Sequence, residues 1–535
     1  MGAHELLVGL LLALAVLGST LAARRVGIPY PVVLVVLGLG AGFVPGVPVP
    51  TLDPDVVFFL FLPPLLYSAA FLSSPRELAR HALPIGLLAF VLVVATTCIV
   101  AVVVHVLLPQ LGWALAFVLG AVVAPTDPVA ATAVMRRLGV PERLRTIVEG
   151  ESLVNDGLAL VLFAVALEAA RTGAFSFGSS AVELVRAVGA GIAIGLAVGW
   201  LAGQVRRRID DRNVEIGLSL VTPFAAYLAA EEAGGSGVLG VVACGLLLGW
   251  ISSDLTDPGT RLEATAFWNV LSFGLNAAIF VLIGLQLPEI ASPPGGQATV
   301  ELVAYGIGVS AVVIGLRVAW QLIVPHAVAG LGASRELLDP RRSLPERLVV
   351  GWSGMRGAVS LAAALSIPLV GLSGEELRGR SVVLFVTFVV ICTTLVLQGT
   401  TLPFVIRAFA LGEGDRREHE LTVARREVTA AALARMDELD EREEIPAELL
   451  ESLRGVYEHR LARLEGELAE EELEDRPDLD HETYRRFRRE LLSAERERLR
   501  ALHAEGLLTF EQVREIQREL DLAETLVDGG EGGGA

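Results

Sequence analysis

The sequence predicts an all-α polytopic membrane protein of about 13 transmembrane helices with a cytoplasmic helical tail, and two observations favour this class. Hydrophobic residues make up 53% of the 535 residues, and the mean hydropathy is +0.59, far above that of an average soluble domain. The net charge of −18 is unevenly spread, because the acidic residues gather in the last quarter of the chain. A membrane domain followed by a charged, water-exposed region accounts for both observations.

The apolar segments set the number of predicted helices. A membrane span needs about 20 apolar residues. By this criterion, candidate spans lie at 5–22, 29–46, 54–72, 83–108, 113–135, 150–170, 182–204, 214–231, 236–252, 266–287, 299–325, 346–370 and 380–410. Arginines concentrate in the loops after odd-numbered spans, so the positive-inside rule places the N-terminus outside and the C-terminal tail in the cytoplasm.

Composition divides the chain into two predicted domains. Residues 1–411 hold all the spans and form the transmembrane domain. Residues 412–535 are dense in Glu and Arg, a pattern typical of amphipathic helices with salt bridges on their exposed faces. The glycine-rich end of this tail is predicted to be disordered.

The sixth span begins with a polar stretch, residues 151–157. Glu151, Ser152, Asn155 and Asp156 fall on one helical face, directly before an uncharged run from Leu158. Two carboxylates at membrane depth are costly, so such groups normally face a cavity, a partner or an ion. The alternative is a cytoplasmic loop, with the helix starting near Leu158.

The fifth span is predicted to be broken at residues 124–128. Pro125 and Pro128 remove backbone donors and disfavour helix in the residues before them. Unwound backbone at membrane depth is tolerated where it lines a cavity or is buried in protein, and there it brings Thr126 and Asp127 to helix ends that can serve an ion. In the alternative reading, which is compatible with this one, Asp127 caps a short second half-helix.

The twelfth span carries Arg356 between Gly354 and Gly357, which permit an irregular backbone. A buried arginine needs an anion, and Glu151 and Asp156 are both candidates; alternatively, Arg356 snorkels toward the cytoplasmic face. The two interrupted spans are seven apart. This odd offset predicts inverted-topology repeats, with spans 4–6 matching 11–13.

Three separated motifs carry a family resemblance. Pro-Thr-Asp-Pro at 125–128, Gly-Glu-Ser-Leu-Val-Asn-Asp-Gly at 150–157 and Gly-Met-Arg-Gly-Ala-Val-Ser at 354–360 resemble those of the monovalent cation:proton antiporters. The most similar branch is that of the bacterial NhaP-like and animal sodium/proton exchangers. The resemblance covers about residues 1–411, with the motifs in the same order and at the same membrane depth.

The resemblance implies roles for the ion site. Asp156 matches the aspartate that binds either the cation or the proton. Asn155 matches a neighbour that is asparagine in the exchangers held to be electroneutral. Asp127, Thr126 and Ser152 match groups on or near the monovalent cation.

The same resemblance implies a structural role for two further charges. Glu151 and Arg356 match a buried ion pair that organises the site and holds spans six and twelve together. We therefore expect Glu151 to contact Arg356.

The expected function is secondary active antiport, not enzymatic catalysis. We expect electroneutral exchange of a monovalent cation, Na⁺ in the first place, for H⁺ by alternating access, serving pH homeostasis. The expected setting is a multi-pass homodimer in the bacterial cytoplasmic membrane, with no cofactor and no nucleic-acid partner. The alternatives are K⁺/H⁺ antiport, a cation channel, and a membrane-anchored signalling scaffold whose working part is the tail.

Removing the tail separates the scaffold from the antiporter. Truncation after Leu411 should leave cation/proton exchange measurable in proteoliposomes but shift its pH profile or the thermal stability of the protein, because the tail carries few large apolar residues. Complete loss of exchange in a truncated protein that is still folded would favour the scaffold.

Overall fold

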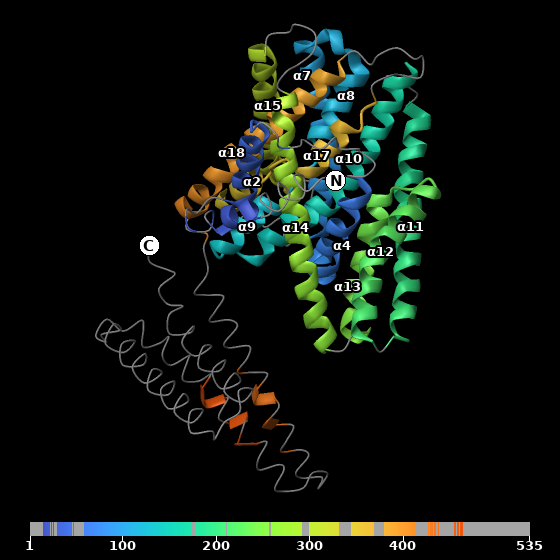
Figure 1. Ribbon diagram of the computed structural model, residues 1–535, viewed down its shortest axis with the longest axis vertical. Coiled ribbons are helices and arrows are strands. Elements are labelled where there is room, and N and C mark those ends of the chain that lie inside the picture. Colours follow the sequence, from blue (N-terminus) through green and yellow to red (C-terminus); the bar gives the residue numbers. More distant parts are fainter. Residues whose placement is uncertain are drawn as a thin grey trace, which may run out of the picture. The chain divides into compact units, whose positions relative to one another are not determined.

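The protein is described here by a computed structural model, shown in Figure 1. It divides into two units, Met1–Glu413 and Gly414–Ala535. The predicted tail lies almost wholly outside the described residues, as does part of the first predicted span, 5–22. The described residues are 14–21, 23, 25, 29–44, 47, 58–173, 177–209, 211–255, 258–290, 299–330, 344–368, 379–409 and 411, with scattered positions between 426 and 463.

Every regular element among the described residues is a helix, as predicted. The elements are α2 (Tyr30–Gly42), α4 (Leu62–Leu72), α5 (Pro75–Arg80), α6 (Ala82–Gly86), the π-helical η1 (Leu87–Leu92), α7 (Val93–Leu107), η2 (Pro109–Leu111), α8 (Gly112–Val123), α9 (Val129–Arg137), α10 (Glu142–Thr172), α11 (Phe177–Arg206), α12 (Arg212–Glu232), α13 (Gly237–Leu255), α14 (Pro258–Ile290), α15 (Thr299–Gly330), α16 (Leu344–Trp352), α17 (Ala358–Leu365) and α18 (Arg380–Ala408).

Each predicted span from 29–46 to 380–410 coincides with a helix or with a run of consecutive shorter helices. By length and composition, seven helices in the described part of the chain could cross a membrane, and four further apolar helices are shorter. The total of 13 spans and the inverted repeat remain predictions.

Two spans are broken, as predicted. The chain leaves the helix between α8 and α9 at residues 124–128, and again between α16 and α17 at residues 353–357. The polar stretch at 151–157 lies inside α10, which begins nine residues earlier at Glu142. The alternative of a loop ending near Leu158 is therefore wrong.

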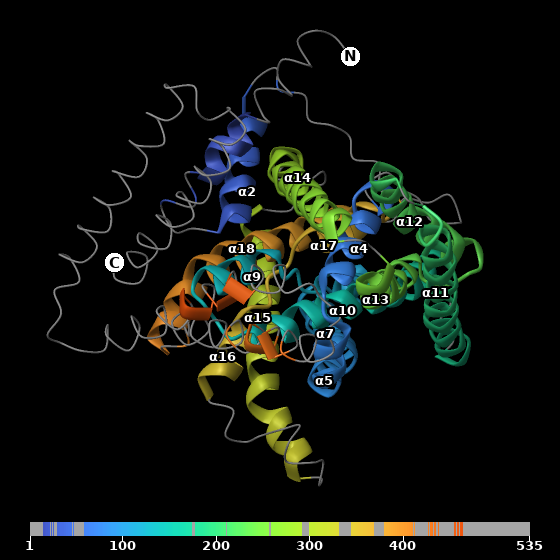
Figure 2. The same cartoon turned by 90° about the horizontal axis from the view of Figure 1, so that it is seen from below.

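The helices form two groups around α10. Figures 1 and 2 show α11, α12 and α13 together on one side of the transmembrane unit, and α2, α9 and α18 on the other. On the first side, α11 packs along α13 through Gly195 and Gly240; on the second, α2 packs along α14 through Gly38 and Gly284. A Cβ at Gly195, Gly38 or Gly284 would collide with backbone atoms of the facing helix, so each pair needs glycine for the backbones to approach.

This close approach predicts a position-specific effect of adding one methyl group to α14. Gly284→Ala should destabilise the protein by about 1–3 kcal/mol, because the new Cβ meets the Val35 carbonyl of α2. Gly274→Ala is the matched control in the same helix, since nothing lies within 4 Å of its Cβ position. Equal thermal shifts for the two variants in detergent would contradict this account of the α2–α14 contact.

Candidate ion-binding site

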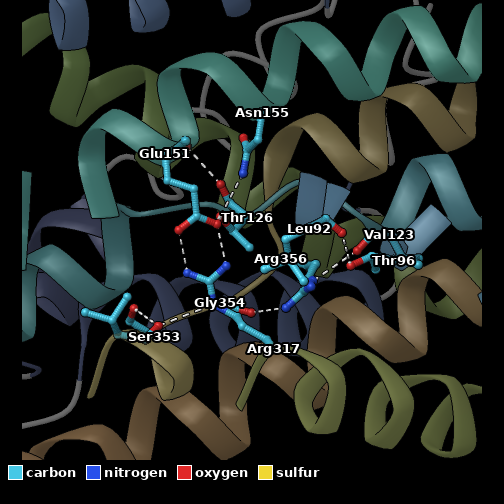
Figure 3. A network of polar contacts seen from close by, with 12 residues as sticks. Leu92, Thr96, Val123, Thr126, Glu151, Asn155, Arg317, Ser353, Gly354 and Arg356 are labelled. Carbon is cyan, nitrogen blue, oxygen red and sulfur yellow. Dashed lines mark hydrogen bonds and ion pairs between the residues drawn. The ribbon is translucent and has the colours of Figure 1, made fainter. Parts of the chain in front are cut away.

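The two broken spans meet where each is unwound. The backbone N–H of Asp127 donates a hydrogen bond of 2.7 Å to the carbonyl of Met355, which joins the α8–α9 break directly to the α16–α17 break. Four half-helix ends therefore lie near one another, and each exposes backbone groups without intrahelical partners. Figure 3 shows the polar network around this crossing.

Arg356 stabilises the carbonyl end of α8. Its Nε donates to the carbonyl of Val123 at 3.0 Å, and its Nη1 donates to the carbonyl of Gly354. The Arg356 backbone N–H donates to Thr394 Oγ1 of α18 at 3.1 Å. Only 2% of Arg356 is exposed, so the snorkelling alternative is wrong. The guanidinium is placed at the negative end of a half-helix dipole.

Glu151 pairs with Arg317 of α15, so the expected Glu151–Arg356 pair is wrong. Arg317 Nη2 donates to Glu151 Oε2 at 2.7 Å, and Nη1 donates to Oε1, which makes the pair bidentate. Both side chains are at most 2% exposed. Arg317 Nε also donates to the Val350 carbonyl near the end of α16, at 3.3 Å. The carbonyl end of α16, like that of α8, thus accepts a hydrogen bond from an arginine.

Sequence reasoning missed Arg317. The signal was present: it is a single arginine in an otherwise uncharged stretch of the eleventh predicted span, which is the same argument that singled out Arg356.

Asp127 lies at the two amino ends of the crossing. Its Oδ1 accepts a hydrogen bond of 2.9 Å from the N–H of Val129, in the first turn of α9. The start of α17 lies against the same carboxylate, with the backbone of Ala358 next to it. Gly357 leaves the space that the carboxylate occupies, since a Cβ there would collide with it. Asp127 therefore accepts from the first amide of α9, as the alternative reading expects of a capping side chain, although the N-cap position itself is Pro128.

The polar face of α10 is attached to the first break through Thr126. Ser152 Oγ donates to the Thr126 carbonyl at 2.8 Å, and Asn155 Nδ2 donates to the Thr126 hydroxyl at 2.9 Å. That hydroxyl in turn donates to Glu151 Oε1 at 3.3 Å. The predicted residues of spans five and six are thus brought together, with Thr126 as the shared partner.

Asp156 differs from the other buried carboxylates. It lines a cavity of about 430 Å³ together with Ser152, Thr126 and Asp127. Within the described part of the chain, no hydrogen bond or ion pair is formed with its carboxylate. Only 6% of Asp156 is exposed, so this carboxylate is buried and yet open to the cavity.

Some polar residues of the crossing line the cavity, where an ion can reach them, and others do not. Glu151, Asn155 and Arg356 are not among its lining residues, whereas carboxylate, hydroxyl and amide oxygens from several helices are. The polar lining groups on the opposite wall include three from α14: Asn269, Ser272 and Asn276. Oxygen ligands of this kind suit hard cations.

The described residues thus form an all-helical chain with apolar spans, two of which break and cross beside a carboxylate-lined cavity. This is the architecture of a multi-pass membrane transporter rather than an enzyme. The chain belongs to the sodium/hydrogen exchanger family, whose transmembrane region matches residues 11–408.

Individual relatives agree with this assignment. An uncharacterized Na⁺/H⁺ exchanger of Mycobacterium tuberculosis is 37% identical, over 96% of this chain and 94% of the relative. The Na⁺/H⁺ antiporter ApNhaP of Aphanothece halophytica is 35% identical, over 77% of this chain and 75% of its own. The solved structure of the sodium proton antiporter MjNhaP1 from Methanocaldococcus jannaschii has the same fold, with a TM-score of 0.58 over 77% of this chain and all of that one, at 20% identity.

The geometry predicts which arginine is coupled to Glu151. Glu151→Gln and Arg317→Gln should each lower the free energy of unfolding by about 3–5 kcal/mol, because each leaves a buried charge without its partner. The double variant should lose less than the sum, and the coupling should exceed that of Glu151 with Arg356 in a parallel thermal-shift cycle. Additive losses for Glu151 and Arg317 would contradict the pairing.

Proposed function

We propose that the protein exchanges Na⁺ for H⁺ across the membrane by alternating access, with Asp156 binding either ion. One observation carries this proposal: Asp156 is the buried carboxylate of the crossing that faces the cavity without a protein partner. Glu151 is occupied by Arg317, and Asp127 accepts from the first backbone amide of α9. The family assignment supports antiport of a cation and a proton.

The charges of the site support one-for-one exchange. Arg317 and Arg356 formally balance Glu151 and Asp127, so Asp156 leaves one negative charge. One proton or one monovalent cation neutralises it, and both together would leave an uncompensated positive charge in a buried site. The neighbouring Asn155 adds no second carboxylate. Each cycle then moves one cation against one proton without net charge.

The position of the cavity supports alternating access. One wall comes from the broken spans and the helix between them in sequence, that is, from α9, α10 and the start of α17. The other wall comes from α4 and α14 and includes Tyr30 of α2. Asp156 thus lies at a boundary between two sets of helices. Movement of one set against the other changes the side from which the carboxylate is reached.

We further propose that this exchange takes place in the bacterial cytoplasmic membrane, with the C-terminal tail in the cytoplasm and two copies forming a homodimer. The basis is the arginine distribution of the loops and the family resemblance. No cofactor is needed, because the transported ions themselves drive the cycle.

Replacing Asp156 tests the mechanism. In proteoliposomes with an imposed pH gradient, Asp156→Asn should reduce cation-driven proton movement to background while the purified protein keeps its thermal stability. Glu183→Gln, which removes an exposed acid of α11, should behave as wild type. Substantial exchange by Asp156→Asn would refute the proposal. Parallel assays with Na⁺, K⁺ and Li⁺ identify the cation, and non-saturating flux without proton coupling would indicate a channel.

A further inference from the structure

A third acidic residue, Glu149, lies at the exposed end of the same cavity. Arg136, in the last turn of α9, and Glu149 of α10 both line it and form an ion pair of 3.0 Å between Nη2 and Oε1. Their side chains are 65% and 30% exposed, whereas Asp156 is 6% exposed. An ion entering the cavity from solvent therefore meets this pair before it meets Asp156.

The spacing along α10 connects Glu149 with Asp156. Glu149, Ser152 and Asp156 stand at i, i+3 and i+7 on one helical face, and the rise per residue puts Glu149 about 10 Å from Asp156 along the axis. Asn269 and Asn276 of α14 repeat this spacing, with Ser272 between them, on the opposite wall. Oxygen-bearing side chains thus line the cavity from the exposed pair to the buried carboxylate.

We propose that Glu149 is the entry site for the transported cation and that Arg136 is its built-in competitor. When the two are paired, the mouth of the cavity carries no net charge. A cation that displaces Arg136 from Glu149 exchanges one ion pair for another. An exposed pair of this kind contributes little to stability, so the exchange is easy. This proposal rests on the proposed exchange at Asp156 and adds to it a residue that binds the incoming cation first.

The two partners should have opposite effects on apparent affinity. Glu149→Gln leaves Arg136 alone at the mouth and should raise the apparent KM for Na⁺ by roughly three- to tenfold, at the low end of focusing effects in a charged cleft. Arg136→Gln should lower the apparent KM, because Glu149 then has no competitor. Glu149→Asp, which keeps the charge, should stay near wild type. Both shifts should shrink when choline chloride raises the ionic strength.

The Glu77–Arg80 pair of α5 supplies a matched control. It is a 2.6 Å ion pair of similar exposure that does not line the cavity, so Glu77→Gln should leave the apparent KM unchanged. The assay is initial-rate Na⁺/H⁺ exchange in proteoliposomes, with Asp156→Asn as the inactive reference. If Arg136→Gln does not fold, the contrast between Glu149→Gln and Glu149→Asp decides.

The outcomes separate the two proposals. An unchanged KM in Glu149→Gln, or a shift of the same sign in Glu149→Gln and Arg136→Gln, overturns the entry site while an inactive Asp156→Asn still supports the exchange mechanism. Activity in Asp156→Asn overturns the exchange mechanism itself. Opposite shifts that are weakened by salt, with an unchanged Glu77→Gln, support Glu149 as the entry site.

Discussion

The need to satisfy backbone groups where two helices break inside the membrane determines the arrangement of the site. A broken span exposes carbonyls at one half-helix end and amides at the next, and each is expensive to leave unpaired away from water. The protein meets this need with charged side chains. Arg356 and Arg317 bind the carbonyl ends of α8 and α16, and Asp127 accepts from the amide end of α9 and lies beside that of α17.

This constraint gives three chemically similar carboxylates different tasks. Glu151 is held by a bidentate arginine, and Asp127 is held by a backbone amide, so both are used to build the crossing. Asp156 is buried and lines the cavity, but unlike Asp127, which lines it too, its charge is not used by the described residues around it. Partner and access, rather than residue type, distinguish the proposed ion-binding group from the structural ones.

The sequence was sufficient to predict features that are local. The prolines of residues 124–128 and the glycines beside Arg356 predicted both breaks, and helical spacing predicted the polar face of α10. It was not sufficient to predict the partner of Glu151, because hydrophobic periodicity identifies spans but not which spans touch. Arg317 lies 166 residues away from Glu151, and the carbonyl partners of Arg356 exist only because the helices break.

The contacts of the crossing stay within one group of helices. Arg356 links the α16–α17 break to α8 and α18, Glu151 links α10 to α15, and Asp127 links both breaks. These elements belong to the predicted spans 4–6 and 11–13, which the proposed mechanism moves as one body. The polar network therefore stabilises the inside of that body. The cavity lies at its surface, against α4 and α14, where Ser152, Asp156 and the first break are presented to an ion. A proposed movement at this boundary can expose Asp156 to either side without breaking the buried ion pair that positions it.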